Sequence, residues 1–136
     1  MAANIIVDAS FLVALLGKRD THRSWAIEQA RQYPRPWHTC DAIIAEAFHM
    51  LGVQGGQGLI GVLRRQSLVL RFSLAENVEP VLDLMNKYRD VPMSFADACL
   101  VRMTEILADP LVLTTDADFR VYRRHSRQVV PCILPR

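Results

Sequence analysis

Acidic residues stand next to apolar segments at four separate places along the chain. The residues in question are Asp8, Glu46, Asp97, Asp116 and Asp118. A carboxylate beside apolar walls loses hydration, and it is stabilised there by a paired cation, by backbone donors or by a bound metal ion. If the fold brings these groups to one edge, they form a site for a hard cation.

The donor atoms of this set favour magnesium or manganese. All of them are carboxylate oxygens, and hard oxygen donors select Mg²⁺ or Mn²⁺ over zinc. The four histidines lack H-x-x-x-H spacing, and the three cysteines lack a C-x-x-C pair. A bound ion lowers the pKa of a water molecule, and a second ion ~3.5–4 Å away stabilises a leaving oxygen. Such a site hydrolyses phosphodiesters without a protein nucleophile.

Each acid, taken alone, also has a structural explanation. Asp97 stands three residues after a serine, the spacing of a capping box, and Asp116 or Asp118 is placed to cap a short helix. Asp8 suits a helix N-terminus through the helix dipole, and Glu46 suits a solvated helix surface. In their helices, however, Glu46 and Asp97 each lie ~60° beyond the edge of an apolar stripe. This common position at the rim of a buried face favours a shared site.

Strands and helices alternate along the chain and must position these acids. Strands are predicted at residues 4–7, 37–39, 68–72, 111–114 and 129–133. Helices are predicted from a Ser10 cap to residue 16, between residues 21 and 34, and at 41–51, 75–88, 94–107 and 118–124. Residues 52–61 hold five of the six glycines and are predicted to form a flexible turn between helices.

This alternation predicts an α/β fold with a parallel sheet covered on both faces, because parallel neighbours need helical crossovers. Ligands of such sheets bind outside the carboxyl ends of the strands. Asp8 and Asp116 each follow a predicted strand. We therefore expect these two side chains to meet at the carboxyl edge of the sheet.

The size and composition predict one domain over residues 1–136. The 51% hydrophobic content is enough for a substantial core, and no apolar run approaches the ~18 residues of a membrane span. No basic segment precedes the apolar stretch near the start of the chain, which argues against export. Three unpaired cysteines, Cys40, Cys99 and Cys132, suit buried thiols in a reducing compartment. We expect a cytoplasmic protein with no membrane partner.

Four segments together resemble the motifs of a known family. Residues 6–10, 45–47, 95–98 and 113–119, in this order and approximate spacing, resemble the PIN-domain nucleases. The short chain, Asp20 with His22 after the first helix, and residues 88–94 before the third acid resemble the stand-alone VapC-type toxins. The resemblance spans nearly the whole chain, and the glycine-rich residues 52–61 are the feature that it does not place.

The resemblance implies a three-layer α/β/α sandwich with a mainly parallel central sheet, and divalent-metal-dependent cleavage of RNA. It implies an acidic catalytic quartet, which comprises Asp8, Glu46, Asp97 and Asp116. We assign Asp8 and Asp97 as central ligands of Mg²⁺ or Mn²⁺, Asp116 as a ligand or water-orienting group, and Glu46 as a water-mediated ligand or base. The family also implies a cognate antitoxin protein and a homodimer.

Three further residues are implied as auxiliaries of this site. Ser10 and Thr114 would be hydroxyl partners of the acids. Asp118 would orient the site through an arginine, or it would cap the helix that follows, and the two roles carry similar weight.

A cluster of negative charge repels a phosphodiester, so the substrate needs cations beyond the site. A basic segment directly after Asp118 offers four arginines for the flanking phosphates: Arg120, Arg123, Arg124 and Arg127. Tyr122 or His125 within it would stack on an unpaired base. An ordinary solvated surface explains the segment equally well. Arg64 and Arg65 form a second, weaker candidate.

Three functions are compatible with these sequence features. The leading one is a metal-dependent endoribonuclease that acts as the toxin of a toxin–antitoxin pair. An Asp-based phosphatase or phosphoacceptor is less favoured, since its chemistry usually wants a lysine near the phosphoryl group and neither Lys18 nor Lys87 follows a late strand. A non-catalytic RNA-binding or protein-interaction module on the same fold is the third, and the complete set of acids argues against it.

Overall fold

The computed structural model describes residues 3–136, and its centre is a five-stranded parallel sheet. The strand order is β3-β2-β1-β4-β7, with β1 (Asn4–Val7) between β2 (Trp37–His38) and β4 (Pro110–Leu113). The edges are β3 (Leu68–Val69) and β7 (Cys132–Ile133). In the longest pairing, Asn4 to Val7 lie opposite Pro110 to Leu113. The prediction of an α/β fold with a mainly parallel sheet is confirmed.

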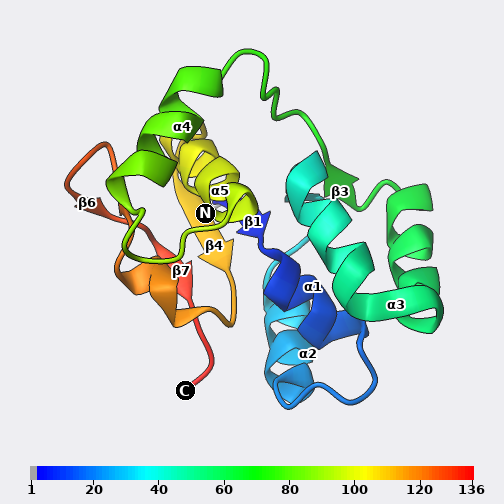
Figure 1. Cartoon of the computed structure of the whole chain (residues 1–136). Coiled ribbons are helices and arrows are strands. Elements are labelled where there is room, and N and C mark those ends of the chain that lie inside the picture. Colours follow the sequence, from blue (N-terminus) through cyan, green and yellow to red (C-terminus); the bar gives the residue numbers. More distant parts are fainter. Residues whose placement is uncertain (1–2) are drawn as a thin grey trace.

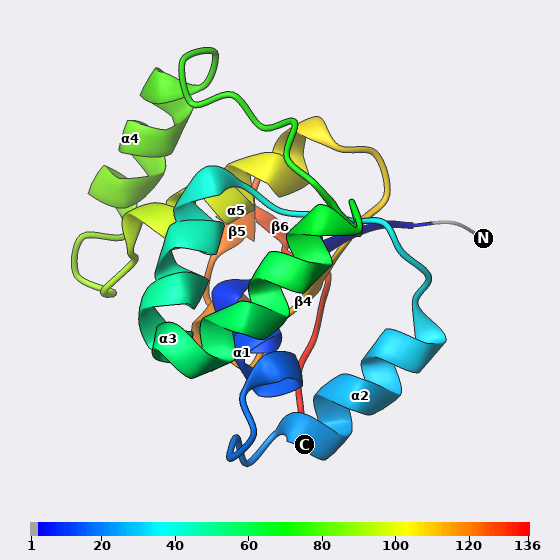
Figure 2. The ribbon, with the colours of Figure 1, turned by 90° about the vertical axis from the view of Figure 1, so that its right-hand side faces the viewer.

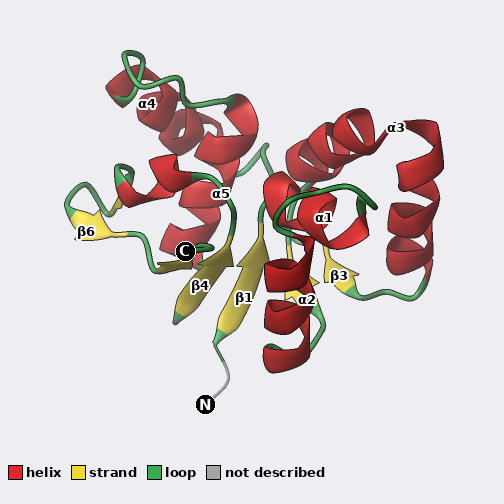
Figure 3. Cartoon of the chain, turned by 90° about the horizontal axis from the view of Figure 1, so that it is seen from below, coloured by secondary structure: helices red, strands yellow, loops and turns green. Residues whose placement is uncertain are grey.

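Helices cover the sheet in two groups (Figure 1). On one side α1 (Ala9–Leu16) packs against α2 (Arg23–Gln32) and α3 (Asp41–Arg64). On the other side α4 (Val78–Lys87) packs against α5 (Phe95–Ile106). The start of α3 also contacts α5, which joins the two groups above the sheet. Figure 3 shows the sheet strands between these helical layers. No helix in the described part of the chain is long and apolar enough to cross a membrane.

Two aromatic clusters fix the helices on the sheet. Phe11 of α1 meets Trp25 and Trp37 edge-on, with ring centroids 5.8 and 5.6 Å apart. Tyr122 meets Tyr88 and Phe119 edge-on, both at 5.2 Å. Such pairs contribute ~0.5–1.5 kcal/mol beyond the area that they bury. The clusters therefore hold α1 and the segment after β4 at fixed positions beside the sheet.

The glycine-rich segment is helical, and the prediction of a flexible turn at residues 52–61 is wrong. Helix α3 continues to Arg64 and bends at Gly52, whose φ of 70° and ψ of −170° lie outside the helical region. Figures 1 and 2 show the two arms of α3 on either side of this bend. The other glycines of the segment lie in regular helix, where a Cβ on Gly55 would stand 3.0 Å from Leu51, a tight contact, and one on Gly58 would make an ordinary contact 3.5 Å from Leu16. Only Gly52 needs its conformational freedom.

The C-terminal region is also less regular than predicted. A 3-10 helix, η1 (Ala117–Arg120), replaces the expected helix at 118–124, and a hairpin of β5 (Arg123–Arg124) and β6 (Gln128–Val129) follows. The predicted strand at 129–133 is divided into β6 and β7, because Pro131 supplies no N–H for a continuous ladder. The strand predicted at 68–72 is confined to β3, and the helix predicted at 75–88 begins at Val78.

The bend in α3 yields a stability prediction. Gly52→Ala places a side chain at a backbone conformation that is almost restricted to glycine, although no atom lies within 4 Å of the new Cβ. We expect the variant to lose ~1–3 kcal/mol of unfolding free energy in urea, from backbone strain alone. Gly58→Ala is the matched control, because it lies in regular helix and should gain up to ~1 kcal/mol. Equal effects of the two substitutions would contradict this account.

Candidate active site

Asp8 lies at the junction of β1 and α1, where the chain leaves the sheet. It is the N-cap of α1, and its Oδ1 accepts the N–H of Ala9 at 2.8 Å. Its own N–H donates to the Leu113 carbonyl at 3.1 Å, which ties the end of β1 to the end of β4. The prediction that Ser10 caps this helix is wrong. The residue one position before the helix has the extended backbone that a cap requires, and that residue is Asp8.

Ser10 and Thr114 hold the second oxygen of Asp8. Both hydroxyls donate to Asp8 Oδ2 at 2.8 Å, and the two hydroxyl oxygens lie 3.0 Å apart. Ser10 Oγ also accepts the N–H of Thr115, and Thr114 Oγ1 accepts the N–H of Asp116, each at 3.0 Å. This network connects β1, α1 and the segment after β4. It fixes the direction of the Asp8 carboxylate.

Asp97 is held in the first turn of α5 by a capping box. The Ser94 hydroxyl accepts the N–H of Asp97 at 3.0 Å, and Asp97 Oδ2 accepts the N–H of Ser94 at 3.2 Å. The same oxygen accepts the Tyr122 hydroxyl at 3.1 Å. Tyr122 is fully buried, so the prediction that it stacks on an unpaired base is wrong. Its contact with Asp97 was not anticipated from the sequence, because the two residues are 25 positions apart.

Asp116 and Asp118 follow β4 and differ in role. Asp116 is the N-cap of η1, and its Oδ1 accepts the N–H of Asp118 at 2.9 Å. Of the two residues proposed as caps, Asp116 is therefore the one whose side chain caps. Asp118 lies in the first turn of η1 and is half-buried.

Glu46 reaches the cluster from α3. It is half-buried, and its carboxylate accepts no hydrogen bond within the described residues. Burial raises its pKa, and the charges of Asp97 and Asp116 raise it further. Because Glu46 is partly shielded from water, these charges act on it more strongly than they would in bulk water. The structure thus brings Asp8, Glu46, Asp97 and Asp116 together from four different elements.

The cluster is electrostatically unbalanced. Burial raises the pKa of Asp97 to about 6, with further contributions from the charges of Asp8 and Asp116. Burial also raises the pKa of Asp8, although three hydrogen bonds oppose the shift. Among the described residues, the side-chain ion pair joins Arg102 to Glu105, so no side-chain cation pairs with the acids of the cluster. The carboxylates therefore repel one another at neutral pH.

The residues fit a divalent ion that keeps part of its water shell. Their donors are all carboxylate oxygens, and their mutual repulsion is what a bound cation relieves. Across residues 3–136, no three His, Cys or acidic side chains are placed closely enough to enclose an ion by themselves. Mg²⁺ suits this spacing, since it retains several waters and takes only one or two carboxylates directly. Asp8, Asp97 and Asp116 are the candidates for direct contact.

The four arginines after the site are partly engaged within the chain. The Arg123 guanidinium donates to the carbonyls of Arg120, Val121 and Tyr122, and that of Arg124 donates to the Thr104 carbonyl and to Gln128. Arg120 and Arg127 are exposed. The role of these residues in binding phosphate stays a prediction, for which Arg120 and Arg127 have the greater freedom.

Comparison with known proteins agrees with the fold. Residues 5–124 match the family model of the PIN domain. No curated protein is significantly similar to the chain in sequence. The structure is similar to the crystal structure of Mycobacterium tuberculosis VapC20, described as a sarcin–ricin loop cleaving toxin, with a TM-score of 0.73 and 19% identity over 86% of this chain and 93% of that chain. At this identity the similarity supports the fold.

The hydroxyl network yields a first test of the site. Thr114→Val keeps the side-chain shape but removes a donor to Asp8 and leaves the N–H of Asp116 without its acceptor. We expect a loss of ~1–3 kcal/mol in urea unfolding. Thr104→Val is the matched control, because Thr104 is equally buried and its hydroxyl donates only to the Val101 carbonyl. That variant should lose less than ~1 kcal/mol, and a loss as large as that of Thr114→Val would count against the network.

The raised pKa of Asp97 yields a second test. A carboxyl whose pKa is higher in the folded state stabilises the fold when it is protonated. The contribution of Asp97 is therefore complete below pH 3.8 and is lost as the pH rises through its folded-state pKa of about 6. In metal-free buffer, lowering the pH from about 7.5 to 5.5 should raise the unfolding free energy of the wild type by ~1 kcal/mol more than that of Asp97→Asn. Thermal unfolding of both proteins across this range measures the difference. Parallel curves would show that Asp97 does not titrate as described.

Proposed function

Because the chain belongs to the PIN-domain family, we propose that it is a divalent-metal-dependent endoribonuclease that hydrolyses RNA phosphodiesters. The observation that carries this proposal is the gathering of four carboxylates from four elements at one sheet edge, without a neutralising side chain in the described chain. A purely structural cluster would be expected to carry its own cations, because unpaired buried charge is costly. We assign the activity to one nuclease domain over residues 1–136.

The residues divide into two roles at the proposed site. Asp8 and Asp97 would hold Mg²⁺ or Mn²⁺, with Asp116 as a further ligand or as a group that orients a bound water, and the ion would lower the pKa of that water. The Glu46 carboxylate accepts no hydrogen bond from residues 3–136 and has a raised pKa, so it is suited to orient a water or to accept its proton. The hydroxyls of Ser10 and Thr114 direct the Asp8 carboxylate and oppose the rise of its pKa on burial, since hydrogen bonds to a carboxylate favour its charged form.

We propose that the physiological role is that of a toxin controlled by a cognate antitoxin protein. The similarity of fold to VapC20 supports this role, as that protein is described as a toxin that cleaves the sarcin–ricin loop. The proposal includes a homodimer and a cytoplasmic location, where the thiols of Cys40, Cys99 and Cys132 remain free. Arg120 and Arg127 are the proposed contacts for phosphates that flank the scissile bond.

The proposed catalysis predicts the effect of neutralising single acids. Asp8→Asn and Asp116→Asn each keep a side-chain oxygen for capping but remove a negative charge. We expect RNA cleavage by each purified variant to fall ~10²-fold or more, because electrostatic stabilisation at the reacting phosphate is lost. Asp83→Asn on the exposed side of α4 is the control and should cleave normally. Full activity of both folded site variants would remove the basis for the assignment.

The oxygen-only donor set predicts the metal requirement. Cleavage should need Mg²⁺ or Mn²⁺, stop in EDTA, and be restored poorly by Zn²⁺ or Ca²⁺. If the ion binds the folded state and not the unfolded one, it should also raise the unfolding free energy by ~2.7 kcal/mol at an ion concentration 100 times its Kd. Asp97→Asn should reduce this stabilisation. Undiminished cleavage in metal-free buffer would rule out the proposed chemistry.

A further inference from the structure

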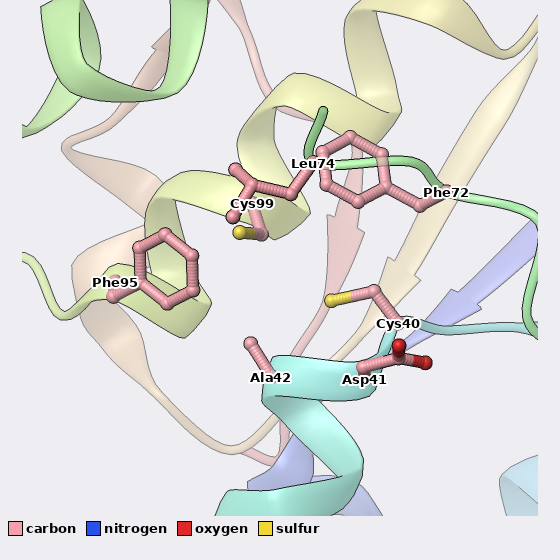
Figure 4. A pocket seen from close by; sticks show the side chains of 7 residues that line it. All are labelled: Cys40, Asp41, Ala42, Phe72, Leu74, Phe95 and Cys99. Atoms are coloured by element: carbon pink, nitrogen blue, oxygen red, sulfur yellow. The ribbon is translucent and has the colours of Figure 1, made fainter. Parts of the chain in front are cut away.

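A pocket of about 330 Å³ lies between the start of α3, the first half of α5 and the segment after β3. The lining residues that carry the argument are Cys40, Asp41, Phe72, Leu74, Phe95 and Cys99. Figure 4 shows Phe95 on one side of this space and Phe72 with Leu74 on the other, with the thiols of Cys40 and Cys99 between them. None of these side chains has a role in the acidic cluster.

The pocket adjoins the acidic cluster. Cys40 follows β2 and Phe72 comes after β3, so the pocket lies along the same carboxyl edge of the sheet as Asp8. Ala42, which also lines it, lies one helical turn before Glu46 on the same face of α3. Phe95 is two residues before Asp97 on α5. A group in the pocket therefore lies beside the proposed reaction site.

The chemistry of the walls suits a flat and neutral group. Phe95 is 40% exposed although it is a large apolar residue at the edge of an acidic site. The lining contains no lysine, arginine or histidine, so it offers no cation to a phosphate. Its volume is at the lower end of the ~300–1,000 Å³ typical of small-ligand pockets. An aromatic base fits these properties better than the sugar–phosphate backbone does.

Asp41 gives the pocket one polar recognition group. It is exposed in the first turn of α3, and its carboxylate is a hydrogen-bond acceptor only. Carboxylates recognise bases through exocyclic amino groups, as in the contact of Asp or Glu with the N4 amino group of cytosine. Uracil carries no exocyclic amino group and offers a carboxylate only its N3–H, on a different edge position. The pocket should therefore discriminate against uracil.

One cation lies beside the base pocket. Arg71 and His38 line a second hollow, which shares Phe72 with the first and continues along α5 beside Met103 and Ile106. Burial lowers the pKa of His38, and the charge of Arg71 lowers it further, so Arg71 supplies the positive charge at neutral pH. Single-stranded RNA is held by this combination of aromatic platforms for bases and cations for phosphates. The positive charge of Arg71 lies outside the base pocket. This separation matches the alternation of neutral bases and charged phosphates along a strand.

We propose that this pocket is a specificity subsite that holds one unpaired, amino-bearing nucleobase of the RNA substrate, stacked on Phe95 and read by Asp41. The inference rests on the proposed nuclease function, since it places the base beside the bond to be cleaved. Phe95 binds the base and Asp41 selects it, while the acidic cluster remains responsible for hydrolysis.

The test compares cleavage of a randomised single-stranded RNA pool by four purified variants and the wild type. Phe95→Leu should lower kcat/KM by ~5- to 150-fold and flatten the base preference at one position near the cleaved bond, because stacking on one aromatic ring is lost. Phe95→Tyr should retain both. Asp41→Asn should lose ~5-fold or more of the discrimination against uracil, since its amide both donates and accepts. Leu82→Ala, an exposed apolar site on α4, is the control and should match the wild type.

A binding arm separates this proposal from the nuclease assignment. A short single-stranded RNA with a fluorescent base analogue is titrated into Asp8→Asn, with and without Phe95→Leu. Weaker binding on loss of Phe95 supports the subsite, whether or not the wild type cleaves RNA. A wild type that cleaves no RNA would refute the nuclease function alone. Cleavage by the wild type that is unaffected by Phe95→Leu and Asp41→Asn would overturn the subsite. So would a defect of Phe95→Leu that is confined to binding a protein partner, which would assign the pocket to protein docking.

Discussion

Mutual repulsion among carboxylates that have lost part of their hydration is the constraint on which the rest of the site depends. Asp8 and Asp97 are buried and Glu46 is half-buried, and in each case burial contributes most to a raised pKa. No side-chain cation in the described chain offsets these charges. A fold that retains such an arrangement gives up stability at neutral pH, and the proposed divalent cation would restore it.

Local backbone bonds keep the acids in place against this repulsion. Asp8 caps α1, Asp97 completes the capping box of α5, and Asp116 caps η1. Each cap uses one oxygen for backbone N–H groups and leaves the carboxylate at the start of a helix or 3-10 turn, where the positive end of the peptide dipoles favours negative charge. Capping and cation binding are therefore not alternatives for these residues. The same side chain performs the structural role and remains available for the proposed chemical one.

The sequence predicted those features that depend on local pattern. Apolar runs located β1 and β4, the Ser94–Asp97 spacing located the start of α5, and the alternation of elements predicted the parallel sheet that brings Asp8 and Asp116 to one edge. Local pattern failed at Gly52, because one bend in a long helix and a flexible loop have the same glycine-rich composition. It also failed for η1 and the β5–β6 hairpin, where Arg124 of β5 bonds to the Thr104 carbonyl of α5.

Long-range contacts within the site were the least predictable from the sequence. Tyr122 with Asp97, and Thr114 with Asp8, meet only after the sheet and α5 have assembled, and their separations of 25 and 106 residues carry no periodic signal. The pocket beside Phe95 likewise combines residues from α3, α5 and the segment after β3. Local sequence patterns locate acids that cap helices, whereas the polar and aromatic surroundings that tune those acids arise from tertiary packing.

The claim that this acidic cluster is a divalent-cation site is tested most directly by a crystal structure of the wild-type protein with Mn²⁺, using the anomalous scattering of the ion. We predict an anomalous peak between Asp8, Asp97 and Asp116, coordinated by at least one of these carboxylates and otherwise by water. A structure at saturating Mn²⁺ with no peak in this cluster, or with ordered ions only elsewhere, would contradict the account.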